Sequence, residues 1–525
     1  MRISRRAGAL GGTTSGVSAL SAALSAAVLV LALAACTGSG SGAVVPPPTP
    51  QPGATVAPTP DLGRFYAQRP TWSACRDGFQ CARIAVPLDY AAPGGPAISL
   101  ALIRLPASDP GHRIGALLVN PGGPGVSGVD FARSAAGEFS ASIRAHYDVV
   151  GFDPRGVGAS TPVQCISDRQ QDAFMAYDAS PQTPAQEQGL FAISRQLAAG
   201  CLANSAALLA HVGTADAARD MDIIRAVMGD AQLHYYGYSY GTFLGAMYAN
   251  EFPRNVGRMV LDGALDPALT ATDLARGQLG GFVKALGDFE ADCVRQKGCP
   301  VGSTISQAQA RIAALIDDAG AHPLHSSTGR PVTQALVVLG VFYPLYEGTY
   351  GWPLLRQALA RAEQGDGDLL LSISDQYAGR DAHGHYPTNE NEATYAVNCL
   401  DRPDHSTVAD YRALAAEFEK TSPLFGAYFA WGDVPCSVWP VSSGVVPGPL
   451  HAVGAAPILV VGTTHDPATP YQWAVNMASE LSSGVLLTRV GEGHTAYGKG
   501  SVCIDTTIEA YLVHWIVPAK AKVCR

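Results

Sequence analysis

A serine lies at the centre of a Gly-Tyr-Ser-Tyr-Gly motif at residues 237–241. A serine hydroxyl is a poor nucleophile unless it is exposed and a neighbouring base takes its proton. A tight turn from a strand into a helix exposes the hydroxyl, and glycines two positions away on either side leave room for that turn. The motif follows an apolar run at 233–236 and precedes a helical pattern at 240–250. This context predicts Ser239 as a catalytic nucleophile.

A glycine-rich loop, Asn-Pro-Gly-Gly-Pro-Gly at residues 120–125, follows the apolar run 116–119. Acyl transfer places negative charge on a carbonyl oxygen, and each N–H group held ready for that charge contributes roughly 10²–10³ in rate. Glycine lets the backbone approach a substrate closely. We therefore expect the oxyanion hole to consist of the N–H groups of Gly123 and of Tyr240, which directly follows the nucleophile. The alternative is a loop with a purely structural role.

Asp466 and His494 each follow a further apolar run, at 458–461 and 485–490. Polar residues at the carboxyl ends of parallel strands meet at one edge of a sheet. The chain order Ser, Asp, His is also the order in which one common fold places its catalytic triad. His494 would take the proton of Ser239 and return it to the leaving group, while Asp466 orients the imidazole ring.

Three other polar residues near these motifs are interpreted as structural. His465 is expected to belong to the loop around Asp466, and Asp153 and Arg155 are expected to form a pair that braces the loop after residues 147–152.

Apolar runs bounded by glycine and proline predict strands that are covered on both faces. They lie at residues 83–88, 98–105, 116–119, 147–152, 233–238, 259–261, 458–461 and 485–490. Helical patterns at 214–228, with Thr214 as its expected N-cap, at 240–250 and at 504–515 alternate with them. This alternation predicts an α/β fold with a mostly parallel, doubly wound sheet.

The pattern becomes mainly helical over residues 266–453, for example at 305–319 and 354–364. We interpret this stretch as a helical cap inserted between two strands. The core would then consist of residues 61–265 and 454–525.

The first 35 residues have the features of a signal peptide. Arginines precede an apolar stretch that is too short to span a membrane, and Leu-Ala-Ala-Cys at 33–36 resembles a bacterial lipobox. Cys36 is expected to carry a lipid, and two acyl chains suffice for stable anchoring. Residues 36–60 are rich in proline, glycine, serine and threonine, which predicts a disordered linker.

These features predict export to a bacterial cell envelope, with the chain anchored in the membrane on its outer face. Ordinary cleavage and secretion is the alternative. The net charge of −9, without a basic block, argues against a nucleic-acid partner. The sequence leaves the oligomeric state open.

The chain has 11 cysteines. If Cys36 is lipidated, the even number that remains is typical of disulfides in an exported protein. The sequence does not determine connectivity, and the simplest arrangement pairs residues 75–81, 165–201, 293–299, 399–436 and 503–524. No Cys-x-x-Cys or His-Glu-x-x-His motif occurs, so neither a metal nor a cofactor is expected.

Together, these motifs resemble those of the secreted tripeptidyl aminopeptidase-like (TAP-like) α/β-hydrolases, which are relatives of the prolyl iminopeptidases. The resemblance runs from about residue 72 to 524 and includes Val-Pro-Leu-Asp-Tyr at 86–90 and the cysteine-containing C-terminal region. It implies an α/β-hydrolase fold and release of short peptides, often tripeptides, from free N-termini. Prolyl iminopeptidases usually have histidine where this chain has Pro121, which favours the tripeptidyl branch.

A peptidase of this kind needs an anion for the substrate α-ammonium group, since a buried unpaired cation is costly. The candidates are Asp262, Glu347 and Asp401, of which Asp401 is preferred. For each of them a structural ion pair or cap is the alternative.

The sequence thus predicts a serine exopeptidase that acts on peptides through an acyl-enzyme. One alternative is a carboxylesterase or lipase, because those enzymes share the Gly-x-Ser-x-Gly motif. Another alternative is a binding protein that kept the fold and lost catalysis.

Overall fold

The computed structural model of the chain describes residues 44–46, 48–76 and 78–525. The expected signal peptide, the expected lipid site at Cys36 and the start of the expected linker lie outside these residues. Among the described residues, no single helix is long and apolar enough to cross a membrane; one bent pair of helices meets that criterion only jointly.

The end of the expected linker is ordered, contrary to the prediction that residues 36–60 are flexible. Ala54 is buried, and its carbonyl accepts a hydrogen bond from Arg225 at 2.9 Å. The Gln51 N–H donates to the Gly229 carbonyl at 2.8 Å. The chain therefore packs on the core about ten residues earlier than its composition suggests. Hydrogen bonds from the core satisfy its backbone groups, and such contacts cannot be read from composition.

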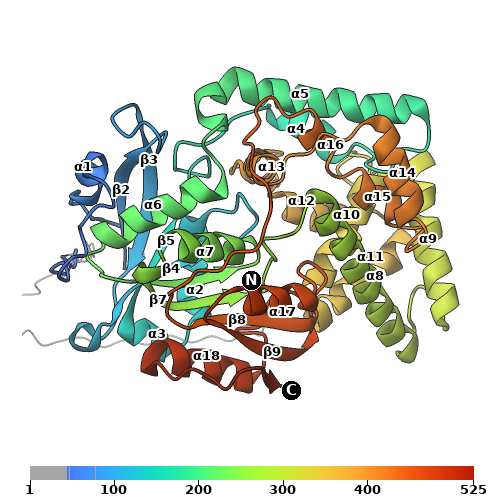
Figure 1. Cartoon of the computed structure of the whole chain (residues 1–525). Helices are drawn as coiled ribbons and strands as arrows, with labels where there is room; N and C mark the ends of the chain where they lie inside the picture. The colour runs from blue at the N-terminus through green and yellow to red at the C-terminus, as the bar shows by residue number, and fades with distance from the viewer. Residues whose placement is uncertain (1–43, 47, 77) are drawn as a thin grey trace, which may run out of the picture.

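A ten-stranded sheet forms the centre of the molecule (Figure 1). Its strands in chain order are β1 (Ser73–Arg76), β2 (Phe79–Pro87), β3 (Ala97–Leu105), β4 (Gly115–Asn120), β5 (Tyr147–Phe152), β6 (Leu233–Tyr238), β7 (Val256–Asp262), β8 (Ile458–His465), β9 (Gly484–Glu492) and β10 (Lys522–Cys524). The spatial order is β1-β2-β3-β5-β4-β6-β7-β8-β9-β10. Pairings from β1 to β5 through β3 are antiparallel, and those from β5 through β4 to β10 are parallel.

Helices cover both faces of the sheet, as the apolar strands require. One face packs against α1 (Gly63–Tyr66), α6 (Thr214–Val227), α7 (Tyr240–Glu251) and α17 (Tyr471–Glu480). The other packs against α2 (Gly128–Glu138), α3 (Ala141–His146) and α18 (Val502–His514). The predicted mostly parallel, doubly wound α/β-hydrolase sheet is therefore confirmed. Because the strands from β4 to β9 run parallel, their carboxyl ends share one edge.

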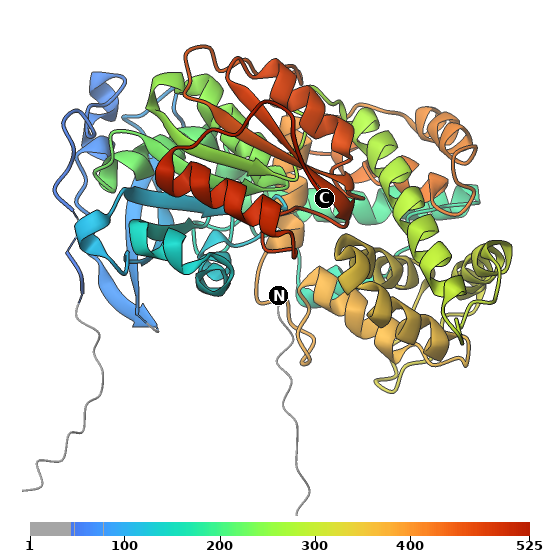
Figure 2. The ribbon, with the colours of Figure 1, turned by 90° about the horizontal axis from the view of Figure 1, so that it is seen from below.

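A helical region lies between β7 and β8, beside the sheet (Figure 2). Its helices are α8 (Ala271–Arg295), α9 (Ile305–Ala321), α10 (Gln334–Tyr346), α11 (Trp352–Ala362), α12 (Asp368–Ala378), α13 (Glu390–Asp401), α14 (Val408–Phe418), α15 (Gly426–Ala430) and α16 (Val434–Ser437). We call this region the cap. It has an apolar core of its own, to which α5 (Pro184–Leu209) adds Leu190 and Phe191, while α4 (Asp168–Met175) precedes α5. Short 3₁₀ helices lie at Pro60–Leu62, Pro110–His112, Pro253–Asn255 and Gly348–Tyr350.

Threonine side chains begin several of these helices. The hydroxyls of Thr183, Thr270, Thr304 and Thr407 accept the N–H of the third helical residue, which satisfies one of the free donors of a first turn. Thr214 does not do so, contrary to expectation: it is the first residue of α6, and Gly213 is the N-cap. Its hydroxyl is used in a different contact, described below.

Within the described residues, five disulfides connect the cysteines in sequence order, as the simplest pairing predicts. They join Cys75 to Cys81, Cys165 to Cys201, Cys293 to Cys299, Cys399 to Cys436 and Cys503 to Cys524.

Candidate active site

Ser239 occupies a strained turn between β6 and α7. Its φ and ψ angles are 54° and −124°, in a region that residues with a side chain rarely adopt. A Cβ on Gly237 would lie 2.4 Å from the Gly241 carbonyl oxygen, so only glycine fits there. The turn is fixed by the Ser239 N–H, which donates to the Asp262 carbonyl at 2.9 Å, and by the Ser239 carbonyl, which accepts the Thr242 N–H at 2.8 Å.

The glycine-rich loop after β4 lies directly against this turn. A Cβ on Gly122 would approach the Ser239 Cβ to 2.9 Å and the Tyr240 nitrogen to 3.0 Å. Gly122 and Gly123 have φ angles of 97° and 105°, which glycine adopts without strain. Neither the Gly123 nor the Tyr240 N–H donates a hydrogen bond to any residue the structure describes. Both N–H groups of the expected oxyanion hole are thus available to a ligand.

Asp466 follows β8 and binds the ring of His494, which follows β9. Both carboxylate oxygens lie 2.9 Å from the His494 Nδ1. The Asp466 side chain is buried and also accepts the N–H groups of Ala468, Thr469 and Thr495 at 2.9–3.2 Å. These donors hold the carboxylate in one orientation, and the carboxylate in turn fixes the tautomer of the imidazole so that Nε2 is free to accept a proton.

The His494 ring faces the end of β7, beside the serine turn. Its Cε1 would lie 3.1 Å from a Cβ on Gly263, and the residue before that glycine accepts the Ser239 N–H through its carbonyl. The Nε2 atom is buried and has no hydrogen-bond partner among the described residues. The sheet edge therefore brings the serine turn, the acid and the histidine together, with the basic nitrogen of the ring unoccupied.

The cap also contacts His494, a feature that no sequence motif indicated. The His494 N–H donates to the carbonyl of Tyr346, the last residue of α10, at 2.7 Å. The two rings meet edge to face with centroids 5.7 Å apart. Thr469 adds a hydroxyl that donates to Asp466 at 3.0 Å and lies 3.3 Å from the His494 Nδ1. The cap and the Thr469 hydroxyl thus hold the ring in place.

The three acids expected to bind a substrate amine are engaged in other contacts. Asp401 binds the Thr214 N–H at 2.9 Å and the Thr214 hydroxyl, which also contacts the Tyr240 hydroxyl, and burial raises the pKa of Asp401 to about 6. Asp262 is fully buried and accepts the Tyr236 hydroxyl at 2.9 Å. Glu347 forms an ion pair of 2.8 Å with Lys499, which lowers the pKa of the carboxyl.

These contacts do not favour any of the three as the amine-binding group. Both oxygens of Asp401 bind Thr214 at the start of α6, and the Thr214 hydroxyl contacts the hydroxyl of Tyr240. Asp401 thus connects α6 to the residue that follows Ser239. Asp262 supports the histidine loop by accepting the Tyr497 N–H at 3.0 Å. Structural roles were the alternative for each residue, and the geometry favours them.

His465 belongs to an ionic cluster between the core and the cap. Its Nδ1 contacts Glu492 and lies 3.3 Å from Asp288 of α8. The three ligand atoms lie within 4.8 Å of one another, so they could hold a cation, although Lys284 already neutralises Asp288 at 2.8 Å.

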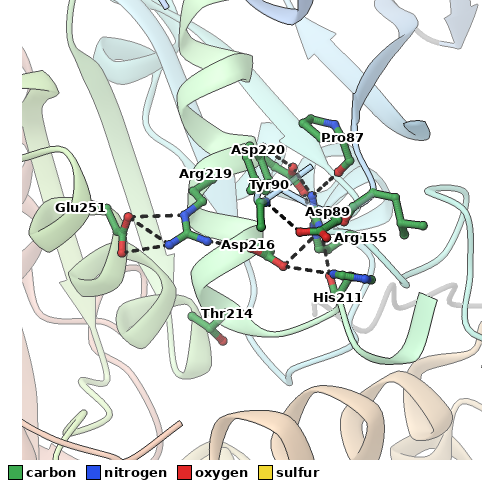
Figure 3. Close-up of polar contacts among 12 residues, drawn as sticks. Pro87, Asp89, Tyr90, Arg155, His211, Thr214, Asp216, Arg219, Asp220 and Glu251 are labelled. Atoms are coloured by element: carbon green, nitrogen blue, oxygen red, sulfur yellow. Dashed lines mark hydrogen bonds and ion pairs between the residues drawn. The ribbon is translucent and has the colours of Figure 1, made fainter. Parts of the chain in front are cut away.

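Asp153 and Arg155 do not pair with each other, contrary to expectation. Asp153 accepts the Ser127 hydroxyl at 2.6 Å and the Val129 N–H at 3.0 Å, which fixes the start of α2 after the glycine loop. Arg155 is fully buried and binds Asp220 of α6 through two nitrogens, at 2.7 and 2.8 Å (Figure 3). The two residues brace different sides of the same loop.

The guanidinium of Arg155 uses all five of its N–H donors. Besides Asp220, it donates to the carbonyls of Pro87, Leu88 and His211 at 2.8–3.0 Å. Figure 3 shows this group between the end of β2 and helix α6, with Asp216 beside it. The buried charge is therefore fully compensated, as an arginine with a planar five-donor fork allows.

Comparison with known proteins agrees with this geometry. Residues 422–524 match the TAP-like protein family, and residues 115–308 match the α/β hydrolase fold family. The chain is 37% identical to the serine protease Hip1 of Mycobacterium tuberculosis, over 86% of this chain and 90% of that protein. It is 38% identical to carboxylesterase B of the same organism, over 90% and 93%. Identity to the tripeptidyl aminopeptidase of Streptomyces lividans is 30%, over 85% and 83%. The chain therefore belongs to the TAP-like family of α/β-hydrolases and is a serine hydrolase.

Proposed function

We propose that this protein is a serine exopeptidase that releases short peptides, in particular tripeptides, from free N-termini. Ser239 attacks the scissile carbonyl while the His494 Nε2 takes the hydroxyl proton. The imidazolium is stabilised by Asp466, and the N–H groups of Gly123 and Tyr240 bind the oxyanion. His494 then protonates the leaving amine. A water molecule then attacks the acyl-enzyme with the same help from His494 and the oxyanion hole, and the short peptide is released.

The observation that carries this proposal is that both carboxylate oxygens of Asp466 lie 2.9 Å from the His494 Nδ1, while the Nε2 of the same ring is free beside the serine turn. Peptide substrates are supported by the relatives named serine protease and tripeptidyl aminopeptidase. The relative named carboxylesterase B favours an esterase as the second candidate.

A panel of amide substrates separates these functions. We expect release of p-nitroaniline from tripeptidyl p-nitroanilides with a free amine, and much slower release from dipeptidyl, aminoacyl and N-acetylated tripeptidyl forms. Hydrolysis of short acyl esters without release from any free peptide would favour the esterase. Equal turnover of the free and N-acetylated forms would argue against an enzyme that acts from the N-terminus.

We further propose that Cys36 is lipidated and anchors the enzyme at the outer face of a bacterial cell membrane. Mass spectrometry of the mature protein should find a diacylglycerol thioether on this cysteine, and Cys36→Ala should release the protein from the membrane fraction. An unmodified, soluble wild-type protein would contradict the anchor and favour secretion.

A further inference from the structure

We propose that Glu390, the first residue of α13, binds the α-ammonium group of the peptide substrate. This inference rests on the proposed function, because it names the group that would make the peptidase act from a free N-terminus. It assigns the role that Asp262, Glu347 and Asp401 do not fit, since their carboxylates bind other parts of the chain.

The backbone around Glu390 is held rigidly on the core. The side chains of Asn389, Glu392 and Thr394 bind backbone groups of the core at 2.5–2.9 Å. Asn391 donates to the last carbonyl of α12 at 2.8 Å. Among the polar side chains of residues 389–394, only the Glu390 carboxylate has no hydrogen bond or ion pair with a described residue. An unpaired carboxylate on a firmly held backbone segment is available to a ligand at a low cost in ordering.

Glu390 lies against the same glycine loop that contacts the nucleophile. A Cβ on Gly125 would lie 2.5 Å from the Glu390 carbonyl oxygen, whereas Gly122 lies against Ser239. Gly122 and Gly125 are three residues apart, so their Cα atoms lie at most about 10 Å from each other. An extended tripeptidyl group has about the same length, so the amine of a tripeptidyl group on Ser239 can extend to the segment that carries Glu390.

The chemistry around the carboxyl suits an ammonium ion. Burial alone raises the pKa of Glu390 to about 7, and no cation in the described part of the chain offsets it. Burial chiefly raises the pKa of Tyr343 and Tyr377, and the nearby Glu390 carboxylate raises both further. The Tyr377 ring lies 6.3 Å from that of Tyr346, the residue that contacts the catalytic histidine. A substrate ammonium would neutralise this carboxylate.

Asp433 is the competing carboxyl of the cap. Burial raises its pKa to about 7 as well, and its side chain has no hydrogen-bond partner within the described chain. The cation Arg402, however, lies near enough to stabilise its charged form. Its charge is therefore already partly compensated, and Asp433→Asn is a matched control for Glu390→Gln.

The test measures kinetics of wild type, Glu390→Gln, Glu390→Asp and Asp433→Asn on tripeptidyl p-nitroanilides with free and N-acetylated amines. We expect Glu390→Gln to lose about 100-fold in kcat/KM on the free-amine substrate, mainly through KM, as for removal of one partner of a desolvated charge pair. Glu390→Asp should recover part of that loss. Turnover of p-nitrophenyl acetate should change less than about twofold in every variant, which shows that the catalytic residues are intact.

The outcomes separate this assignment from the proposed function. An unchanged ratio of free to acetylated turnover in Glu390→Gln, with wild type preferring the free amine, would overturn the assignment alone. Loss of the preference in Asp433→Asn instead would move the role to that residue. A wild-type enzyme that hydrolyses the acetate ester and no peptide would refute both proposals.

Discussion

The carboxylate of Asp466 is the most strongly oriented group of the candidate site. It accepts backbone N–H groups from three residues and a hydroxyl from Thr469 while it binds His494. The imidazole is held from its other side by Tyr346. A base that is fixed before the substrate arrives needs no reorganisation during proton transfer, which favours catalysis at this edge of the sheet.

Replacing Asp466 by asparagine should leave the shape of the loop and lower kcat by about 10⁴, because the ring then loses its tautomer preference and its imidazolium loses a counter-charge. Steady-state kinetics on the free tripeptidyl p-nitroanilide measure this. Asp262→Asn is the control, since Asp262 binds Tyr236 and Tyr497 rather than the ring. A loss below tenfold for Asp466→Asn, or an equal loss for both variants, would contradict the assigned role.

Glu390 should make folding stability depend on pH. Its pKa is about 7 in the folded protein, above the value of about 4.3 in an unfolded chain. The native state therefore binds more protons between these values, and the stability contribution of this group falls as pH rises through that window. Tyr343 and Tyr377 stay neutral there, because the ordinary pKa of tyrosine, about 10, already lies above this window and burial raises theirs further.

Glu390→Gln removes the desolvated charge, so its Tm relative to wild type should be higher at pH 8 than at pH 5. Thermal unfolding at the two pH values tests this, with the exposed Glu419→Gln as a control that should show no such difference. The same Tm difference at both pH values would show that the carboxyl is not desolvated.

Among the secondary-structure elements, the sequence predicted the long apolar strands well and the short edge strands not at all. The predicted run 233–238 coincides with β6, and 147–152 coincides with β5. By contrast, β1 is exposed along its whole length, so no apolar pattern marks it. It pairs antiparallel with β2, and the Cys75–Cys81 disulfide also joins the two strands. Both are contacts between residues rather than local preferences.

The residues of the candidate site likewise divide into those that local sequence marks and those that only the fold brings together. Ser239, Asp466 and His494 each end or follow a strand within a short motif, so local pattern was enough to propose them. The contacts of Tyr346 and the unpaired carboxyl of Glu390 depend on how the cap packs against the core. Asp401 is the preferred candidate for the amine from sequence, and only the fold reveals that it binds Thr214.

The loop after β5 depends on Arg155, and Arg155→Lys should destabilise the protein by roughly 3 kcal/mol. Lysine keeps the charge and cannot serve five acceptors, so buried oxygens are left unpaired. Urea unfolding measures the change. Arg219→Lys, at the partly exposed rim of the same network, should cost less than about 1 kcal/mol. Similar midpoints for the two variants would argue against a tightly coupled buried network.

Across the whole molecule, some disulfides lie within the core and others lie within the cap. The Cys165–Cys201 bridge closes 36 residues, whereas Cys293–Cys299 closes six. Loop closure in the unfolded chain predicts a contribution of about 4 kcal/mol for the first and about 2 kcal/mol for the second. Paired cysteine-to-alanine variants should therefore lower the urea midpoint more at 165 and 201 than at 293 and 299. Equal losses would show that native packing, rather than loop length, sets these contributions.

The cap and the core meet at the candidate catalytic residues. Tyr346 of the cap contacts His494, Glu347 pairs with Lys499, and Thr394 donates to the carbonyl of Pro124 in the glycine loop. A substrate that enters between the two parts would contact both at once. The cap thus has a direct structural route to influence the base and the oxyanion loop.

The central claim is that Ser239, His494 and Asp466 act as one catalytic unit, and covalent labelling tests it most directly. A fluorophosphonate probe followed by peptide mass mapping should find the label on Ser239 in the wild type. Ser239→Ala should remain unlabelled, and His494→Ala should label far more slowly. A label on any other residue, or equal labelling of wild type and Ser239→Ala, would contradict the account.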